Sequence, residues 1–214
     1  MKSKILSLIA SLFYALLSLG QTSSSDSKAL QFKGGVIGGI TMSQIHGDGV
    51  GGFNKLGVNA GFTIQVLNSK YRGVNLGVIY NQKGSRKPPN PNIEGDNTWA
   101  YKFTYFDLPV VYTMEIEGVH VEFGVQPSVL ISAKENMYNV GYDPTGIPVK
   151  DFDLSVVLGA QLQIDHKMRL FTRLTQSAIA IAPKPEDPLN RWNNAMRNMT
   201  LEIGVIALFA LRDK

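Results

Sequence analysis

The charged residues of this sequence that could do chemistry share one parity of a two-residue alternation. A buried carboxylic acid with a raised pKa can serve as a general acid or base. Opposite charges that share an interior can also simply neutralise one another, which requires no route for a substrate. We therefore expect a structural ion-pair network inside the fold rather than a catalytic centre. The expected members are Lys33, Asp107, Glu122, Asp153, Arg169, Arg173 and Glu202.

The histidines and the short motifs offer no further chemistry. His46 falls in a predicted loop, while His120 and His166 flank predicted short turns. Isolated imidazoles without a carboxylate motif give neither a zinc ligand set nor a Ser-His-Asp arrangement. The sequence has no cysteine, and it contains no phosphate-binding loop and no HExxH motif. We predict no catalytic residue, no metal and no cofactor, so the protein is not expected to be an enzyme.

The first twenty residues have the pattern of a secretory signal peptide. Lys2 and Lys4 precede an uncharged apolar run over 5–19, and Ser18-Leu19-Gly20 places small residues at positions −3 and −1 of a cleavage site. We expect residues 1–20 to be removed on export and 21–30 to form a flexible periplasmic segment. An uncleaved anchoring helix is the alternative. A lipid anchor is excluded because it needs a cysteine.

Composition restricts how the exported chain could sit in a membrane. Charged residues make up 18% of the chain, against about 25% in soluble domains. The net charge of +4, or +2 without Lys2 and Lys4, is too small to indicate a nucleic-acid partner. After residue 20 no apolar run reaches the roughly 20 residues of a membrane helix. A closed β-sheet is the remaining way to span a bilayer.

A two-residue alternation runs through the chain and predicts strands. Over 55–67, Val58, Ala60 and Phe62 fall on one face, whereas Asn59 and Gly61 fall on the other. The prediction is an all-β, eight-stranded, antiparallel up-and-down transmembrane barrel covering 31–211. Its expected strands are 31–42, 53–67, 73–84, 99–113, 119–133, 151–164, 168–176 and 198–211.

The expected connections alternate strictly between short and long. This is the layout of outer-membrane barrels, which have tight periplasmic turns and long outer loops. We therefore predict a bacterial outer-membrane location with both termini in the periplasm. The short connections are 68–72, 114–118 and 165–167, and the long ones are 43–52, 85–98, 134–150 and 177–197.

Alternation alone does not say which face is outside, and a soluble lipocalin-like ligand-binding barrel would show the same period. The polar face carries mostly small uncharged residues, whereas a surface in water is about 25–35% charged. Small residues suit the interior of a narrow barrel, which side chains fill. We therefore predict an apolar face toward lipid and a plugged lumen. Expected aromatic girdles are Phe32, Tyr112 and Phe209 at the periplasmic end, and Tyr80 and Phe152 at the outer end.

The long loops are the other candidate sites. Arg86 and Lys87 begin a proline-rich stretch that would project as a semi-rigid arm. Trp99 and Tyr101 begin an alternating aromatic row that could bind a partner or glycan at the rim, and Trp192 lies in the last long loop. The alternative for the aromatic row is a barrel wall that extends above the membrane.

Short motifs along the chain resemble the PorT-like family of outer-membrane β-barrel proteins of Bacteroidota. They are the Gly-rich first strand leading to Ser43 and Gly47-Asp48, the sequence Tyr-Asn-Gln-Lys-Gly at 80–84, and Tyr-Phe-Asp-Leu-Pro at 105–109. The resemblance implies an eight-stranded outer-membrane barrel without established catalytic residues. Its named member takes part in type IX secretion.

Together these observations lead us to expect a structural or accessory component of an outer-membrane assembly, such as a secretion or biogenesis machine. The expected partners are outer-membrane lipids and other outer-membrane or periplasmic proteins. A surface-binding module acting through the long loops is the alternative.

Overall fold

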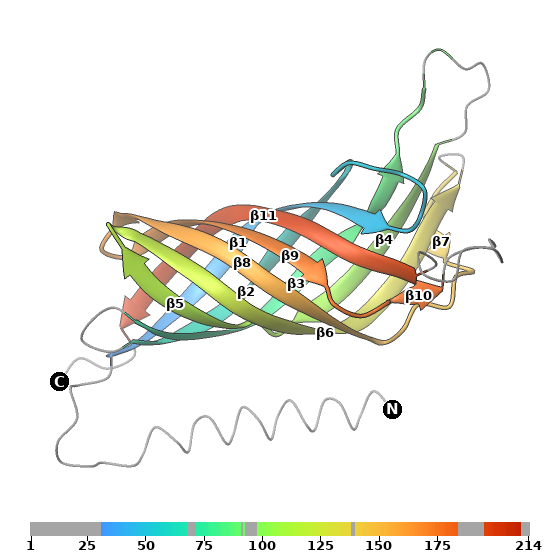
Figure 1. Ribbon diagram of the computed structural model, residues 1–214. Coiled ribbons are helices and arrows are strands. Elements are labelled where there is room, and N and C mark those ends of the chain that lie inside the picture. Colours follow the sequence, from blue (N-terminus) through green and yellow to red (C-terminus); the bar gives the residue numbers. More distant parts are fainter. Residues whose placement is uncertain are drawn as a thin grey trace. The chain divides into compact units, whose positions relative to one another are not determined.

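The predicted alternation produces one antiparallel sheet that closes on itself (Figure 1). Closure comes from the pairing of the first long strand, β1, with both β2 and the last strand, β11. All neighbours in the sheet are antiparallel and, apart from this closing pair, neighbouring wall strands follow one another along the chain, as the sequence predicts. The strands are β1 (Gln31–His46), β2 (Lys55–Leu67), β3 (Gly73–Lys87), β4 (Trp99–Asp107), β5 (Val110–Ile116), β6 (Val119–Met137), β7 (Asp143–Pro144), β8 (Phe152–Asp165), β9 (Met168–Ser177), β10 (Ala182–Pro183) and β11 (Ala195–Ala210).

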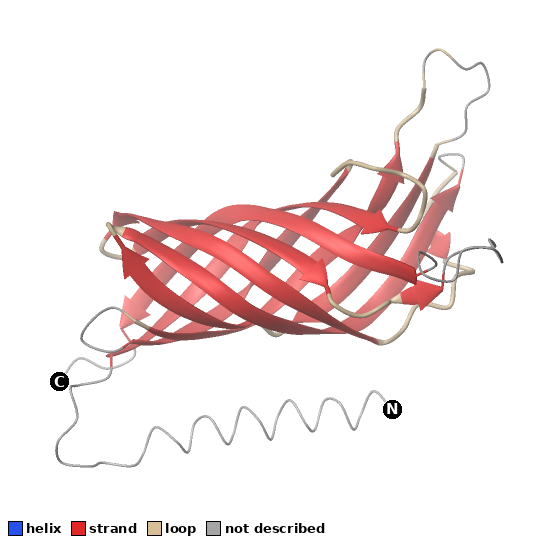
Figure 2. Cartoon of the chain, viewed as in Figure 1, coloured by secondary structure: helices blue, strands red, loops and turns tan. Residues whose placement is uncertain are grey.

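The computed structural model describes residues 31–67, 72–90, 92, 98–137, 140–183 and 195–210. The predicted signal peptide and the predicted periplasmic segment, 1–30, lie outside these residues. In the described ranges, no helix is long and apolar enough to cross a membrane, and Figure 2 shows strands and loops only.

The predicted fourth strand is one wall strand in two pieces. β4 and β5 both pair with β3 on one side and β6 on the other. The interruption falls at Leu108-Pro109, because proline has no N–H to donate to the ladder. Leu108 N still donates to Pro127 O over 2.8 Å, and Gly77 N donates to Pro109 O over 3.1 Å. Counting β4 and β5 as one strand, and leaving out the two-residue β7 and β10, gives the predicted eight.

The strands run further toward the long loops than the sequence predicts. β1 ends at His46, β3 at Lys87 and β6 at Met137, beyond the predicted ends at 42, 84 and 133. Lys87 pairs with Trp99 and Trp99 with Met137, whereas β8 begins at Phe152, opposite Val129. We call the part that rises past β8 the extended wall: residues 82–87 of β3, 99–104 of β4, 132–137 of β6, and β7. The prediction stopped early because loop-type residues such as Gly, Lys and Asn interrupt the apolar alternation here, although the backbone pairing continues.

The two faces of the sheet have the predicted orientation. Large apolar side chains point outward, with Phe62 67% and Val156 55% exposed. The outward aromatics form pairs at two levels: Tyr80 with Phe106, centroids 6.4 Å apart, and Tyr112 with Phe123, 5.3 Å apart. The other predicted girdle residues, Phe32, Phe152 and Phe209, are exposed apolar side chains too.

Glycines allow neighbouring backbones to approach closely inside this narrow barrel. A Cβ on Gly39 would overlap the carbonyl of Ile203, and a Cβ on Gly61 would overlap that of Val78. Any larger residue at either position would require the backbone to shift. The two positions therefore help to set the curvature of the wall.

Arginine introduced on the outward face should oppose insertion into a bilayer. Ala60→Arg and Val125→Arg each place a cation at an exposed apolar position, and we expect each to cost about 2–4 kcal/mol of folding free energy. Urea unfolding in lipid vesicles measures the cost. Ser132→Arg, on the outward side of the extended wall, is the control and should cost about 1 kcal/mol or less. Equal costs for all three variants would contradict this orientation.

Candidate functional site

The barrel interior begins at the short-turn end with a glutamate held by three neighbouring side chains. Arg173 donates to both carboxylate oxygens of Glu122, from Nε over 2.8 Å and from Nη2 over 3.1 Å. Gln161 Nε2 and Asn75 Nδ2 donate to Glu122 Oε1 over 2.6 and 2.9 Å. Arg169 Nη1 donates to the amide oxygen of Gln161 over 3.2 Å. A bidentate pair of this kind, with its remaining lone pairs satisfied, is the geometry that makes burial of two charges tolerable.

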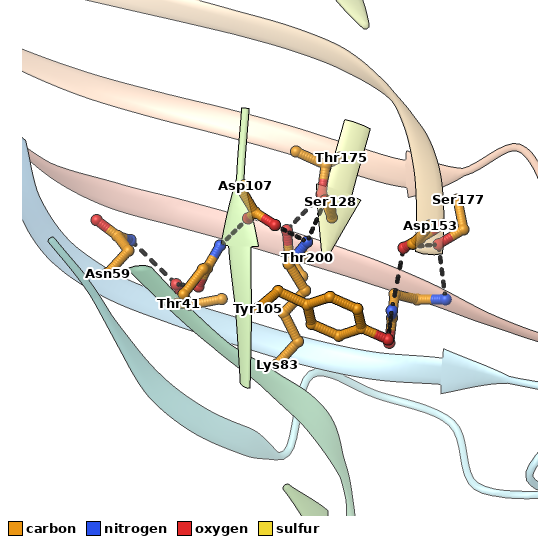
Figure 3. A network of polar contacts seen from close by, with 12 residues as sticks. Thr41, Asn59, Lys83, Tyr105, Asp107, Ser128, Asp153, Thr175, Ser177 and Thr200 are labelled. Atoms are coloured by element: carbon orange, nitrogen blue, oxygen red, sulfur yellow. Dashed lines mark hydrogen bonds and ion pairs between the residues drawn. The ribbon is translucent and has the colours of Figure 1, made fainter. Parts of the chain in front are cut away.

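A second polar layer lies in the middle of the barrel and centres on one asparagine. Asn81 Nδ2 donates to Asp107 Oδ2 over 2.9 Å and to Glu202 Oε1 over 2.7 Å, so one amide bridges two carboxylates. Lys83 Nζ lies 2.8 Å from Asp107 Oδ1, and Thr41 Oγ1 donates to Asn81 Oδ1 over 2.7 Å. Figure 3 shows Thr41, Lys83 and Asp107 converging from different strands. The layer ties β1, β3, β4 and β11 together across the lumen.

Asp153 forms a third polar level closer to the long loops, and its partners are neutral. Ser177 Oγ donates to Asp153 Oδ2 over 2.7 Å, and Asn198 Nδ2 donates to the same oxygen over 3.2 Å (Figure 3). The Lys83 ammonium sits 4.9 Å from the ring centroid of Tyr105 and thereby links this level to the middle layer. The three levels leave the lumen lined and crossed by hydrogen-bonded side chains.

An apolar plug fills the interior beyond the polar layers, at the long-loop end. Phe103 and Tyr105 are fully buried, and the rings of Tyr101 and Phe103 stack with centroids 5.9 Å apart. The loop after β7 packs Ile147 and Val149 against this cluster. The buried members are Ile45, Tyr101, Phe103, Tyr105, Leu130, Ile181, Ala182 and Met196.

The plug corrects the prediction of an aromatic row available at the rim. Tyr101 is buried, and Trp99 is half-buried with its ring 4.9 Å from that of Tyr101. Both residues share the parity of Asp107, which is buried inside the barrel, so the row points into the barrel. Arg86 is exposed and Lys87 is half-buried. Trp192 lies outside the described residues.

The predicted charged network is only partly a network of ion pairs. Glu122 pairs with Arg173, and Asp107 pairs with Lys83, a residue that the prediction missed. Asp153, Arg169 and Glu202 are buried, but their hydrogen-bond partners are neutral side chains. Lys33 does not belong to the network: it is half-buried near the end of β1, and its amine makes no ion pair with the part of the chain that the structure describes.

Parity alone could have identified Lys83. It falls on the same side of β3 as Asn75 and Asn81, both buried, and opposite the outward Val78 and Tyr80. The partner of each charge was harder to predict, because the pairing of Lys83 with Asp107 depends on the register between β3 and β4.

This arrangement does not leave the Glu122 and Asp107 carboxylates free to act as a general acid or base. The Glu122 and Asp107 carboxylates are engaged by cations and amides, and the plug covers them from the long-loop end. His120 is buried near the short turns, whereas His46 and His166 are exposed. No group of three or more potential metal ligands occurs among the residues with a described placement. The geometry suits a rigid, filled interior.

Removing the cation from the Glu122 pair should destabilise the barrel. Arg173→Ala leaves a buried carboxylate without its charge partner, which costs about 3–5 kcal/mol in comparable pairs. Urea unfolding in vesicles measures the loss. The double variant Glu122→Gln/Arg173→Ala removes both charges and should be more stable than Arg173→Ala alone. A double variant less stable than the single one would contradict a neutralising role for the pair.

A filled interior should not conduct ions. The parent protein and Arg173→Ala should both lack a stable open state in planar bilayers, because the apolar plug and the polar layers remain on the path. Large, stable conductance steps from the parent would show that the lumen is open.

This chain is similar to solved structures at low sequence identity. Among curated proteins none matches the sequence. Solved structures similar to this chain include Ail, the attachment invasion locus protein of Yersinia pestis, in complex with the heparin analogue sucrose octasulfate. It is 12% identical with a TM-score of 0.48, over 84% of this chain and 99% of that chain. Neisserial surface protein A is 13% identical with a TM-score of 0.44, over 85% of this chain and 99% of that chain.

The family model named outer membrane protein beta-barrel domain matches residues 20–179. This match and the outward apolar face overturn the soluble lipocalin-like alternative. The chain belongs to the outer-membrane β-barrel domain family and is a protein of the bacterial outer membrane.

Proposed function

We propose that this chain is a closed, non-catalytic barrel that works by contact with a partner protein at its outer end. The long-loop end faces the outside, and both termini lie in the periplasm. The alternation of short and long connections supports this orientation, because outer-membrane barrels have short turns on the periplasmic side. The filled interior carries the proposal: a lumen that passes no solute leaves the surfaces as the places where the protein can act.

The extended wall offers the surface for such a contact. Met137, Val140 and Tyr142 are exposed apolar residues at the end of β6 and in the segment after it, with Val140 85% exposed. Met137 pairs with inward Trp99, whereas the ring of Tyr142 lies 5.8 Å from outward Lys102, so the patch borders the end of the wall on both of its faces. Bilayer contact does not account for the exposure of Met137 and Val140, which lie past the lipid-facing rows. Apolar patches outside the lipid belt mark protein contacts.

Hydrogen bonds anchor the segment that carries this surface to β6 and to the next long loop. Thr145 Oγ1 donates to Glu135 Oε2 over 2.8 Å, and Thr145 N donates to Ala133 O over 3.2 Å. Lys150 N donates to Ile181 O over 2.7 Å, which fastens the far end of the segment to the next long loop. A surface ordered before binding loses less conformational entropy when a partner docks.

An accessory role in an outer-membrane assembly is the more specific form of the proposal. The short motifs shared with PorT-like proteins support a secretion or biogenesis machine as that assembly. A surface-binding module that recognises an external ligand is the second candidate, and the same wall would serve it. The identity of the partner separates the two.

Photo-crosslinking in intact cells tests the contact. A photoreactive amino acid at Met137, Val140 or Tyr142 should give one adduct of the same mass from all three positions. Ile116 and Ile164, exposed apolar residues at the short-turn end, are the matched controls and should not give that adduct.

The substitution Val140→Asp, introduced together with the photoreactive residue at Met137, should abolish the adduct formed from Met137, because a charge in the patch disrupts an apolar contact. Folding of each variant is checked by its heat-dependent migration on a detergent gel. Folded variants that give no adduct from the wall, or the same adduct from the control positions, would overturn the proposal.

A further inference from the structure

The charged residues at outward-facing positions of the strands have one sign at the long-loop end. Arg86 on β3, Lys102 on β4 and Arg197 on β11 have the parity of the outward residues of their strands, and Lys134 on β6 pairs with Lys102, so the four side chains leave the barrel wall. The acids of the extended wall lie on its other side: Glu135 pairs with inward Tyr101 and with Asp143 of β7. The outward rim is therefore cationic throughout the described strands.

Three of these cations belong to a ladder of cross-strand rows on β3, β4 and β6. The lowest row is aromatic and aliphatic, the next is polar and uncharged, and the third contains two directly opposed lysines. From the bilayer outward the rows are Tyr80–Phe106–Val129, Gln82–Thr104–Ser132 and Gly84–Lys102–Lys134, followed by Arg86 in the row above.

The spacing of the rows places the lysines at the level of lipid headgroups. Four residues along a strand span about 13 Å, and a tilt of about 40° reduces this to roughly 10 Å along the membrane normal. The Tyr80–Phe106 pair sits where an aromatic girdle marks the edge of the hydrocarbon, and Gln82 Nε2 donates to the Tyr80 hydroxyl over 2.9 Å. Long lysine side chains can reach back toward this boundary.

The opposed lysines lack a counter-charge from the described protein. Like charges placed directly across two strands are destabilising, and neither Lys102 nor Lys134 has a carboxylate within ion-pair distance in the ranges that the structure covers. Lys102 Nζ lies 5.8 Å from the ring centroid of Tyr142, a contact that positions the ammonium without neutralising it. Two fixed cations beside a lipid-facing wall fit an anion from the surrounding leaflet.

We infer that Lys102 and Lys134, with Arg86 above them, bind the phosphate groups of an anionic glycolipid in the outer leaflet. The inference rests on the proposed orientation, in which the long-loop end faces outward. A lipid is favoured over a soluble anion because the cationic row continues the lipid-facing surface: an acyl chain can lie along Val78 and Phe106 while its headgroup phosphate reaches the lysines. The anchored glycolipid would fix the depth of the extended wall.

Native mass spectrometry of the full chain in detergent, titrated with bisphosphorylated lipid A, tests the inference. The double variant Lys102→Gln/Lys134→Gln should bind this lipid about tenfold more weakly or worse, since each surface cation contributes measurably to anionic-lipid binding. Lys33→Gln/Lys167→Gln makes the same charge change at the short-turn end and should bind as the parent does. Lys102→Arg/Lys134→Arg keeps both charges and should retain binding.

Phosphatase-treated lipid A and inorganic phosphate identify what is recognised. The parent should bind the dephosphorylated lipid about as weakly as the lysine-to-glutamine variant binds the intact lipid, and it should not bind inorganic phosphate at matching concentrations. Equal binding of intact and dephosphorylated lipid, equal binding by the parent and Lys102→Gln/Lys134→Gln, or binding of free phosphate would overturn the inference. Its failure leaves the photo-crosslinking result at Met137 and Val140 untouched, because these two positions lie outside the lysine row, whereas Tyr142 contacts Lys102 and does not separate the two tests.

Discussion

The pairing of β1 with β11 is the constraint on which the rest of the structure depends. It turns a sheet with two edges into a closed wall whose backbone groups bond to neighbouring strands, as a bilayer without water demands. Closure with eight strands also fixes a narrow interior that side chains must fill. Every second residue then faces lipid and every other residue faces this interior, so a single alternation in the sequence determines both surfaces.

The interior resolves a conflict between polarity and burial. Polar residues face inward because the outward face must be apolar, yet a buried polar group is costly unless it is hydrogen-bonded. Glu122 and Asp107 meet this requirement through one cation each and through amides that connect several strands. The apolar plug around Phe103 and Tyr105 completes the filling. With its lumen occupied, the protein presents two usable surfaces, the apolar patch at the end of the extended wall and the cationic row on the outward side of that wall.

Much of this architecture is predictable from sequence, because strand parity is a local property. The faces of β2, the faces of β6 as far as Leu130 and the inward position of Arg173 follow from period two, whereas the lipid orientation also required the small, uncharged residues of the polar face. Beyond Leu130 a register shift opposite Thr104 and Tyr105 breaks the alternation of β6. Pairing partners are not local: Lys83 meets Asp107 through a register that no single strand encodes. The buried aromatic row shows a different failure. Tyr101 has the parity of Asp107, but the aromatic row beside the loop was given two interpretations, a binding rim and a wall extending above the membrane, and neither includes the apolar core that the structure shows.

The most direct test of a closed and filled barrel in lipid is a cysteine scan of β2. Each introduced cysteine is the single thiol of its variant, because the chain contains no cysteine. Single cysteines are placed at positions 58, 59, 60, 62, 63 and 65, leaving out Gly61, where a side chain would overlap the carbonyl of Val78. They are labelled with a fluorophore during refolding and then exposed to a nitroxide quencher dissolved in the bilayer. Quenching should alternate with period two and be strongest at 58, 60 and 62. Unlabelled cysteines at 59, 63 and 65 in the folded protein should resist a water-soluble thiol reagent. Ready reaction at these inward positions, or quenching without alternation, would contradict a closed and filled barrel in lipid.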